Sequence, residues 1–320
     1  MSQNYLDIAR QGKNNWWRYL IGILLIAFFW LIIGGIATAI SLIAVAIFQG
    51  VFTLDSALLQ QQLEEFLKTR STINYVIHNI GFIFFLVGIF LTVKLLHGRK
   101  FLSLVNPEGK ISSIRFFTGF GIWFLMGVLV TGLGILLEPE NIEFAFQPVQ
   151  WFSLVACALI LTPIQTSTEE LFFRGYAIQG LSLITKQPFL LIVFSGLLFM
   201  FPHLSNPEVE RGAIWLALYY FSFGVFCSLI TIKDNRLELA LGIHAANNLF
   251  HIFISTRDSA LPVPSIWFIK QPGDPKWTLM WFLGECAIFY LIVFGLGQRK
   301  KLQSNRTAES QETEEVTSHK

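Results

Sequence analysis

Eight long apolar runs, separated by short polar segments, dominate the pattern of the chain. A stretch of roughly 20 apolar residues is needed to cross a bilayer core about 30 Å thick. By this criterion the runs predict transmembrane helices at 19–48, 73–96, 116–137, 151–173, 189–203, 213–232, 237–255 and 277–296. The first is long enough to require tilting. The pattern therefore predicts an all-α fold, a polytopic membrane helix bundle of about eight transmembrane helices.

The same pattern divides the chain into four parts. Residues 1–18 form a polar N-terminal segment, and 19–150 carry the first three spans. Residues 151–297 carry the other five, and 298–320 are polar, as is typical of a disordered tail. Between the first two spans, 58–67 has helical spacing, which predicts a helix on the membrane surface or packed over the bundle.

Composition supports a membrane protein and excludes some partners. Apolar residues make up 53% of the chain and charged residues 14%, against about 25% charged in soluble domains. The net charge of +2 is too small for a polyanion-binding field, so we expect no nucleic acid partner. Cys157, Cys227 and Cys286 all lie in apolar runs, which favours buried thiols over a disulfide framework or a zinc site.

Lysine and arginine give the predicted orientation. Basic residues are retained on the cytoplasmic side of membrane helices. With eight spans and the N-terminus inside, most Lys and Arg fall in the inner segments, including the cluster from Lys94 to Arg115. The distribution predicts that the N- and C-termini are both cytoplasmic.

Ionisable side chains late in the fourth run are the first candidates for chemistry. A charged residue within a span costs roughly 2.5 to 3.5 kcal/mol, so it requires a reason. On a helix, Glu170 and Arg174 are four residues apart and can form an ion pair. Glu169 points about 100° away and lacks that partner. A carboxylate in such a site is suited to general-base chemistry.

Two further polar elements follow on later helices. The fifth run ends in Phe199, Pro202 and His203, where the proline interrupts the helical hydrogen bonds. In the seventh run, His244 and Asn248 share a helical face and could donate hydrogen bonds to a developing negative charge.

Each polar residue alone could be a simple contact between helices. The combination of two carboxylates, two histidines and an asparagine favours a functional centre. Structural contacts remain the simpler interpretation for His78 and His251, and no partner for Glu285 can be named from the sequence.

These residues resemble the motifs of the CPBP family of intramembrane proteases, also called the CAAX-protease or Abi family. The family order is Glu-Glu-x-x-x-Arg, then Phe-x-x-x-His, then His-x-x-x-Asn on successive membrane helices. The chain has all three, as Glu169, Glu170 and Arg174, then Phe199 and His203, then His244 and Asn248. The resemblance covers about residues 151–255.

The resemblance implies hydrolysis of a peptide bond within the membrane. Glu169 and His203 would activate water, His244 and Asn248 would stabilise the oxyanion, and Glu170 and Arg174 would hold the site. The substrate would be a peptide or a membrane-anchored protein, including a prenylated one. No metal is favoured, although Glu169, His203 and His244 could supply three zinc ligands.

Two other classes of function remain open at this stage. A non-proteolytic membrane partner could use the same polar cavity for binding, and a proton-coupled transporter could use the Glu and His side chains as a relay. The mechanism also requires a geometry that straight helices do not give. His244 lies about 10 Å into its span, but His203 lies near the far end of its own. Either the fifth helix is shifted or broken at Pro202, or the predicted ends of the spans are wrong. In both cases we expect the four side chains to meet in one polar cavity.

Overall fold

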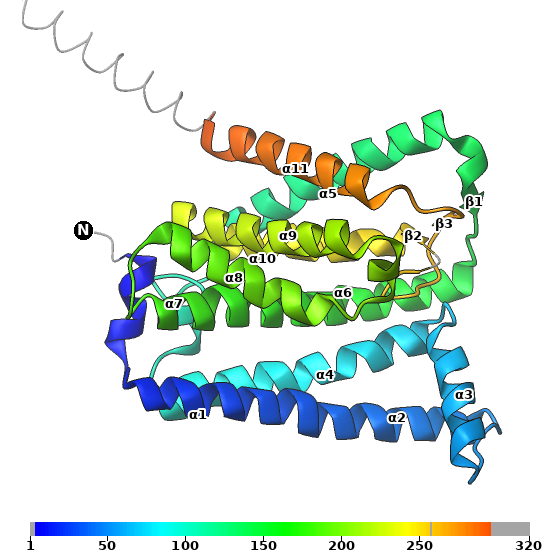
Figure 1. Cartoon of the computed structure of the whole chain (residues 1–320), viewed down its shortest axis with the longest axis horizontal. Coiled ribbons are helices and arrows are strands. Elements are labelled where there is room, and N and C mark those ends of the chain that lie inside the picture. The colour runs from blue at the N-terminus through cyan, green and yellow to red at the C-terminus, as the bar shows by residue number, and fades with distance from the viewer. Residues whose placement is uncertain (1–3, 257, 296–320) are drawn as a thin grey trace, which may run out of the picture.

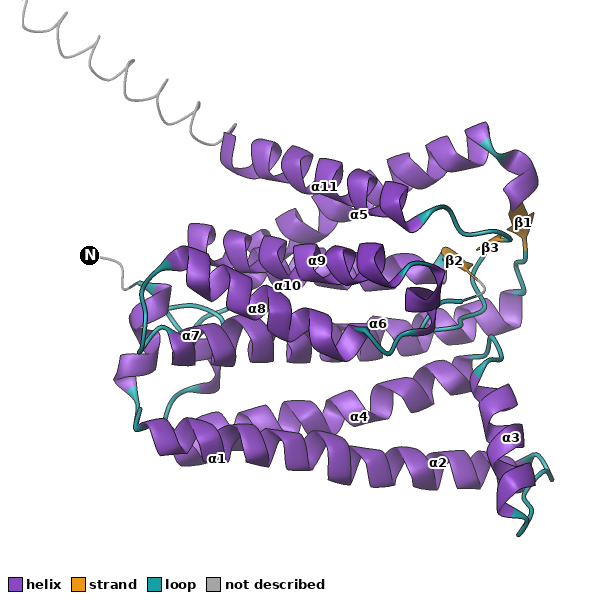
Figure 2. Ribbon diagram, viewed as in Figure 1, coloured by secondary structure: helices purple, strands orange, loops and turns teal. Residues whose placement is uncertain are grey.

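The computed structural model describes residues 4–256 and 258–295, which form a helical bundle (Figures 1 and 2). Six helices are long and apolar enough to cross a membrane: Trp16–Phe48, Thr72–Leu96, Ser113–Leu137, Pro148–Leu181, Ala213–Asp234 and Pro275–Gly295. The all-α, multi-pass bundle is therefore confirmed, whereas the count of eight spans is not. The predicted tail, 298–320, lies outside the described residues.

The helices have the following bounds. They are α1 (Trp16–Ala27), α2 (Gly34–Phe48), α3 (Ser56–Leu67), α4 (Thr72–Leu91), α5 (Ser113–Leu137), α6 (Pro148–Glu170), α7 (Ile178–Leu181), α8 (Pro188–His203), α9 (Ala213–Asp234), α10 (Glu238–Leu249) and α11 (Pro275–Tyr290). A π-helical segment, Phe28–Ile33, joins α1 to α2, and another, Leu171–Ala177, joins α6 to α7. The predicted helix at 58–67 is present as α3.

The bundle is layered around α10 (Figure 1). The α1–α2 helix packs on α4, α4 packs on α6, and α10 contacts α5, α6 and α9. The helix α8 packs on α9, which packs on α11. Most of α10 is buried, including His244 and Ala240. A helix buried on all sides suits the presentation of polar groups to an interior cavity.

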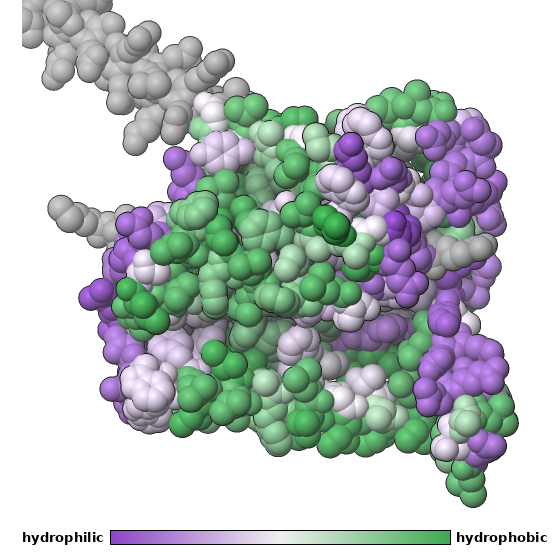
Figure 3. All heavy atoms as spheres, viewed as in Figure 1, coloured by the Kyte–Doolittle hydropathy of each residue, from purple (hydrophilic) through white to green (hydrophobic). Residues whose placement is uncertain are grey.

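The outer surface is apolar along the helices and polar at their ends (Figure 3). Leu24, Ile40 and Leu129 are each more than 60% exposed. Large exposed apolar areas are not tolerated in water but are expected where lipid is the solvent. The surface therefore agrees with a multi-pass membrane protein.

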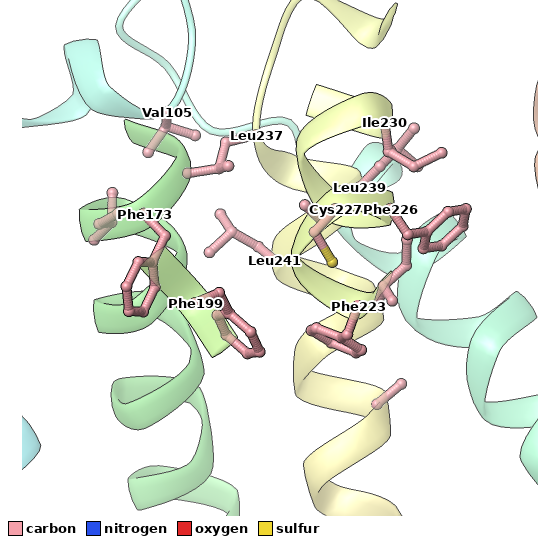
Figure 4. Close-up of a cluster of buried hydrophobic side chains, with 14 of the residues drawn as sticks. Val105, Phe173, Phe199, Phe223, Phe226, Cys227, Ile230, Leu237, Leu239 and Leu241 are labelled. Atoms are coloured by element: carbon pink, nitrogen blue, oxygen red, sulfur yellow. The ribbon is translucent and has the colours of Figure 1, made fainter. Parts of the chain in front are cut away.

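Aromatic side chains form much of the core beside α10 (Figure 4). Phe199 stacks on Phe223 with ring centroids 5.4 Å apart, and Phe173 meets Phe199 edge-to-face at 5.3 Å. Cys227 is buried in the same cluster, and all three cysteines are free, as the sequence predicted. These rings join the helices that carry the polar motifs.

The fifth and seventh apolar runs differ from the expected spans. The helix α8 has 16 residues and begins at a proline, and α10 has 12. The expectation of a helix through residue 255 is wrong, because α10 ends at Leu249 and 254–256 form a strand. The parallel pairing of 254–256 with 267–269, which hydropathy does not report, decides this end.

A small sheet, which the hydropathy pattern did not predict, links the loops at one end of the bundle. It contains β1 (Ile142–Phe144), β3 (Trp267–Ile269) and β2 (Ile254–Thr256), in the order β1-β3-β2. The first pair is antiparallel and the second parallel. The sheet holds the chain that leaves α10 against the chain that leaves α5.

Candidate active site

The two glutamates lie at the end of α6, where the helix continues into the π-helical segment Leu171–Ala177. The expected end of the fourth span near residue 173 is wrong, because the helix continues to Leu181. Arg174 is thus a buried helical residue, not part of a polar loop. Its Nη1 lies 2.7 Å from Oε1 of Glu170, and both side chains are fully buried. The ion pair expected from the spacing is present.

The π-helical segment is held by hydroxyl groups from elsewhere in the chain. The N–H of Ile178 bonds to the carbonyl of Gly175, so it does not bond to the carbonyl of Arg174. The Tyr5 hydroxyl donates to that carbonyl at 3.2 Å, and Ser195 Oγ donates to the carbonyl of Phe173 at 3.3 Å. The sequence carries no local signal for Tyr5, which is 169 positions from its partner.

His203 ends α8 with a defined ring orientation. Its Nδ1 is 2.7 Å from the carbonyl oxygen of Phe199, an acceptor, so Nδ1 carries the proton. The ring is stacked on Phe199 at 4.3 Å and tilted against Tyr220 at 4.6 Å. Its Nε2 lies 4.0 Å from Oε2 of Glu169. The imidazole therefore presents an unprotonated nitrogen towards the carboxylate.

His244 approaches the same carboxylate from α10. Its Nδ1 is 2.7 Å from Oε1 of Glu170, and its Nε2 is 3.8 Å from Oε2 of Glu169. The carboxylate of Glu170 thus binds Arg174 and His244 through one oxygen. By accepting a hydrogen bond from Nδ1, the Glu170 carboxylate fixes the orientation of the imidazole ring and thereby the direction of Nε2.

Asn248 lies one turn after His244 and has an oriented amide. Asn247 Nδ2 donates to Asn248 Oδ1 at 3.1 Å. This bond occupies the acceptor end of Asn248 and leaves its Nδ2 group as the donor. No hydrogen bond joins that Nδ2 to another described residue. Asn247 was not among the sequence candidates.

All four side chains line one cavity of about 440 Å³, as the expected convergence required. They are Glu169, His203, His244 and Asn248, with Phe199 beside them. Glu170 and Arg174 are fully buried and do not line the cavity. Near its polar side, Glu208 Oε1 accepts hydrogen bonds from Tyr220 and from Asn206.

The depths of the helices explain how the side chains meet. Glu238, the first residue of α10, is fully buried and accepts hydrogen bonds from Asn106 and from the N–H of Ser112. The helix α10 therefore begins inside the bundle, below the 105–112 loop. Because α10 starts below the surface, His244 lies deeper than it would if α10 began at the membrane boundary. This depth brings His244 level with His203 at the end of the short α8.

Several cavity residues were not among the sequence candidates, and Glu285, for which the sequence indicated no partner, lies elsewhere. His78, His251 and Gln165 line the cavity. Gln165 could have been found, because it is one helical turn before Glu169 on the same face. Glu285 is half-buried on α11 and is not part of the cavity lining.

The side chains around the cavity include groups that can bind metals. Within residues 4–256 and 258–295, no group of three His, Cys, Asp or Glu side chains is placed to hold a metal ion. Each of the two histidines presents Nε2 to the cavity while Nδ1 is bonded to Phe199 or to Glu170, an orientation that metal-ligating histidines also adopt. The absence of a third suitably placed donor among the described residues is therefore what decides against a metal site. The residues do not form a metal-ligand arrangement as they stand.

Comparison with known proteins agrees with this constellation. Residues 148–250 match the family model described as type II CAAX prenyl endopeptidase Rce1-like. The uncharacterized protein YyaK of Bacillus subtilis (strain 168) is 32% identical over 294 residues, which cover 91% of this chain and 95% of that protein. The chain belongs to the CPBP (CAAX protease) family. No solved structure matches this CPBP-family chain.

The part of the chain that matches the family model includes the four polar side chains that meet in the cavity. The chain is a multi-pass membrane protein of the CAAX-type intramembrane protease family. The matched region begins with α6 and ends just after α10, so it contains all three polar motifs. The matched model is named for a CAAX prenyl endopeptidase.

Proposed function

We propose that this CPBP-family protein is an intramembrane endopeptidase that uses Glu169, His203, His244 and Asn248 as its catalytic residues. One observation carries the proposal. The free oxygen of Glu169 lies within 4.0 Å of Nε2 of both His203 and His244, in a cavity that also includes Asn248. This arrangement combines a base with hydrogen-bond donors around a space that a scissile carbonyl can enter.

In the first step, Glu169 and His203 activate water. A water molecule between the two side chains would donate one hydrogen bond to Glu169 Oε2 and one to His203 Nε2. The carboxylate takes the proton as the water oxygen attacks the carbonyl carbon. The same proton then passes to the nitrogen of the leaving amine as the C–N bond breaks, which leaves a new carboxyl group and a free amine.

His244 and Asn248 stabilise the negative charge on the carbonyl oxygen. Asn248 donates from Nδ2, because Asn247 occupies its oxygen. His244 donates from Nε2 in its protonated form while Nδ1 stays bonded to Glu170. Donors that are already oriented need no reorganisation during the reaction, and loss of one such donor typically lowers kcat by about 10²- to 10³-fold.

The cavity has one wall suited to an apolar substrate group. Trp30, Phe82 and Phe85 line it on the side of the N-terminal helices, whereas Asn206 and Arg211 line it beyond His203. A chain with a lipid group and a polar peptide could place the two parts on these two sides. We therefore propose a membrane-tethered substrate, with a prenylated protein as the leading candidate.

The reaction is proposed to proceed without a metal cofactor. Glu169 and His203 supply the base, and the oxyanion donors are protein groups, so no step requires a Lewis acid. Activity that persists after treatment with a chelator supports this, and activity lost with chelator and restored by zinc contradicts it.

The test is cleavage of a quenched peptide library by the purified full-length protein in detergent. We expect cleavage by the parent and loss of it in Glu169→Gln and His203→Ala. Glu285→Gln is the matched control, because it neutralises a carboxylate within a membrane helix outside the cavity. Cleavage that survives Glu169→Gln would defeat the assignment of the base. Absence of cleavage by the parent, with prenylated peptides included, would favour a binding role.

A further inference from the structure

The helix that begins as α4 continues to Leu96, and this end lies at the membrane boundary, far from the catalytic motifs in sequence. Arg18 Nη1 donates to the carbonyl of Leu96 at 2.7 Å, which joins the start of α1 to this end of the helix. Trp16 is 77% exposed at the start of α1, beside Trp17. Exposed Trp residues with an adjacent Arg mark the level of the lipid headgroups. The end of the helix at Leu96 is therefore at headgroup depth.

A basic pocket opens at this level. It has a volume of about 450 Å³ and is lined by Phe90, Lys94, Gly98, Arg99, Lys100 and Phe101. Three of these residues are cations and none is acidic. Gly98, with φ of +62°, turns the chain sharply after the helix, so that Lys94 and Lys100 border the same pocket.

The three cations have no acidic partners. None forms an ion pair within residues 4–256 and 258–295. Arg99 is 7% exposed, and its Nη2 donates to two neutral acceptors, Gln179 Oε1 at 2.5 Å and Ser103 Oγ at 3.1 Å. A buried charge without a counter-ion is costly, and an anion placed nearby relieves that cost.

A purely structural explanation accounts for only part of this group. Lys94 lies in the last turn of its helix, where a cation interacts favourably with the helix dipole, and its Nζ is 5.3 Å from the Phe90 ring. Neither interaction applies to Arg99, which lies beyond the helix and is buried without a carboxylate. The pocket thus retains an unbalanced positive charge.

We propose that this pocket binds the phosphate group of an anionic membrane phospholipid. The ammonium groups of Lys94 and Lys100 contact the phosphate, and the guanidinium of Arg99 adds positive potential from behind. The acyl chains leave the pocket along Phe90, which is 39% exposed on the outside of α4. A free phosphate has the same chemistry but does not use the apolar side of the pocket.

Binding at this pocket would reach the helix that carries the catalytic residues. Arg99 bonds to Gln179 of α7, and Gln179 Nε2 donates to the carbonyl of Ser103. The helix α7 continues the π-helical segment that follows Glu170. A bound lipid would therefore hold the end of this helix in place, whatever reaction the cavity performs.

The test measures lipid binding by the full-length protein and does not depend on catalysis. The protein is delipidated and titrated with phosphatidylglycerol in phosphatidylcholine nanodiscs, and thermal unfolding and retained lipid by native mass spectrometry are recorded. At about 1 kcal/mol for each cation near an anionic surface, Lys94→Gln with Lys100→Gln should weaken binding by about 30-fold. The rise in Tm with phosphatidylglycerol should then be lost.

Lys68→Gln with Lys110→Gln is the control, because these exposed lysines give the same change in net charge but do not line the pocket. It should bind phosphatidylglycerol as the parent does. Equal loss in the control pair, or full binding by the pocket pair, would overturn the proposal. A separate titration uses inorganic phosphate. An equal rise in Tm with phosphate alone would overturn the lipid as the source of the anion.

Discussion

His244 donates from Nδ1 to Oε1 of Glu170 at 2.7 Å, although the two residues are 74 positions apart in the chain. The same oxygen of Glu170 accepts from Arg174. Glu170 thus connects α10 to the end of α6, and its negative charge balances the positive charge of the fully buried Arg174. Its removal should affect stability and activity together.

We expect Glu170→Gln to lower the free energy of unfolding by about 3–5 kcal/mol, because it leaves Arg174 as a buried charge without a partner. Thermal unfolding in detergent measures the change. The double variant Glu170→Gln with Arg174→Met removes both charges and should regain part of the lost stability. Peptide cleavage should stay low in both, since His244 loses its carboxylate. A double variant no more stable than the single one would contradict the pairing argument.

Gly242 allows α10 to approach α5 closely. A Cβ atom at Gly242 would lie 2.7 Å from the backbone nitrogen of Phe120, a contact that rigid backbone cannot relieve. We expect Gly242→Ala to destabilise the protein by about 1–3 kcal/mol or more and to displace His244, two residues later. The matched control is Gly121→Ala, where no atom lies within 4 Å of the new Cβ. Similar Tm values for the two variants would show that this contact is not limiting.

Tyr5 supports the π-helical segment from the N-terminus. The single proton of its hydroxyl is shared between the carbonyl oxygens of Leu104 at 2.7 Å and of Arg174 at 3.2 Å, and the side chain is fully buried. Tyr5→Phe should lower the free energy of unfolding by about 1–3 kcal/mol, because buried acceptors lose their donor. Tyr290→Phe serves as the control, since no hydrogen bond joins its hydroxyl to another described residue. An unchanged unfolding curve for Tyr5→Phe would exclude this support.

His97 should make stability depend on pH. Its Nδ1 bonds to the carbonyl of Lys13 and its Nε2 to the hydroxyl of Tyr176, and burial lowers the pKa of the ring below its usual 6.5, with Arg99 and Arg18 adding to the effect. The folded state then binds the proton less well than the unfolded state. The stability contributed by the neutral ring is complete above about pH 6.5 and declines as the pH falls below it.

The measurement is thermal unfolding of the parent and of His97→Gln across about pH 5 to 8. Glutamine can keep both hydrogen bonds but does not titrate, so the variant should lose less stability in acid. Parallel curves for the two proteins would show that His97 does not contribute to the pH dependence.

Much of this protein could be predicted from the order of its residues. Apolar runs of membrane length predicted the multi-pass helical bundle, because the bilayer requires long hydrophobic helices. The spacing of Glu170 and Arg174 predicted their ion pair, since residues four apart share a helical face. These predictions succeeded because each depends on neighbours along one helix.

Only the tertiary structure decided what the helices bring together. The helix α10 is short and begins below the surface at Glu238, where segments distant in the chain cover it. The hydrogen bonds from His244 to Glu170 and from Tyr5 to the carbonyl of Arg174 also join segments far apart in the chain. Periodicity within one helix carries no information on such contacts. The sequence determined which side chains are polar inside the membrane, and the packing of α6, α8 and α10 placed them around one cavity.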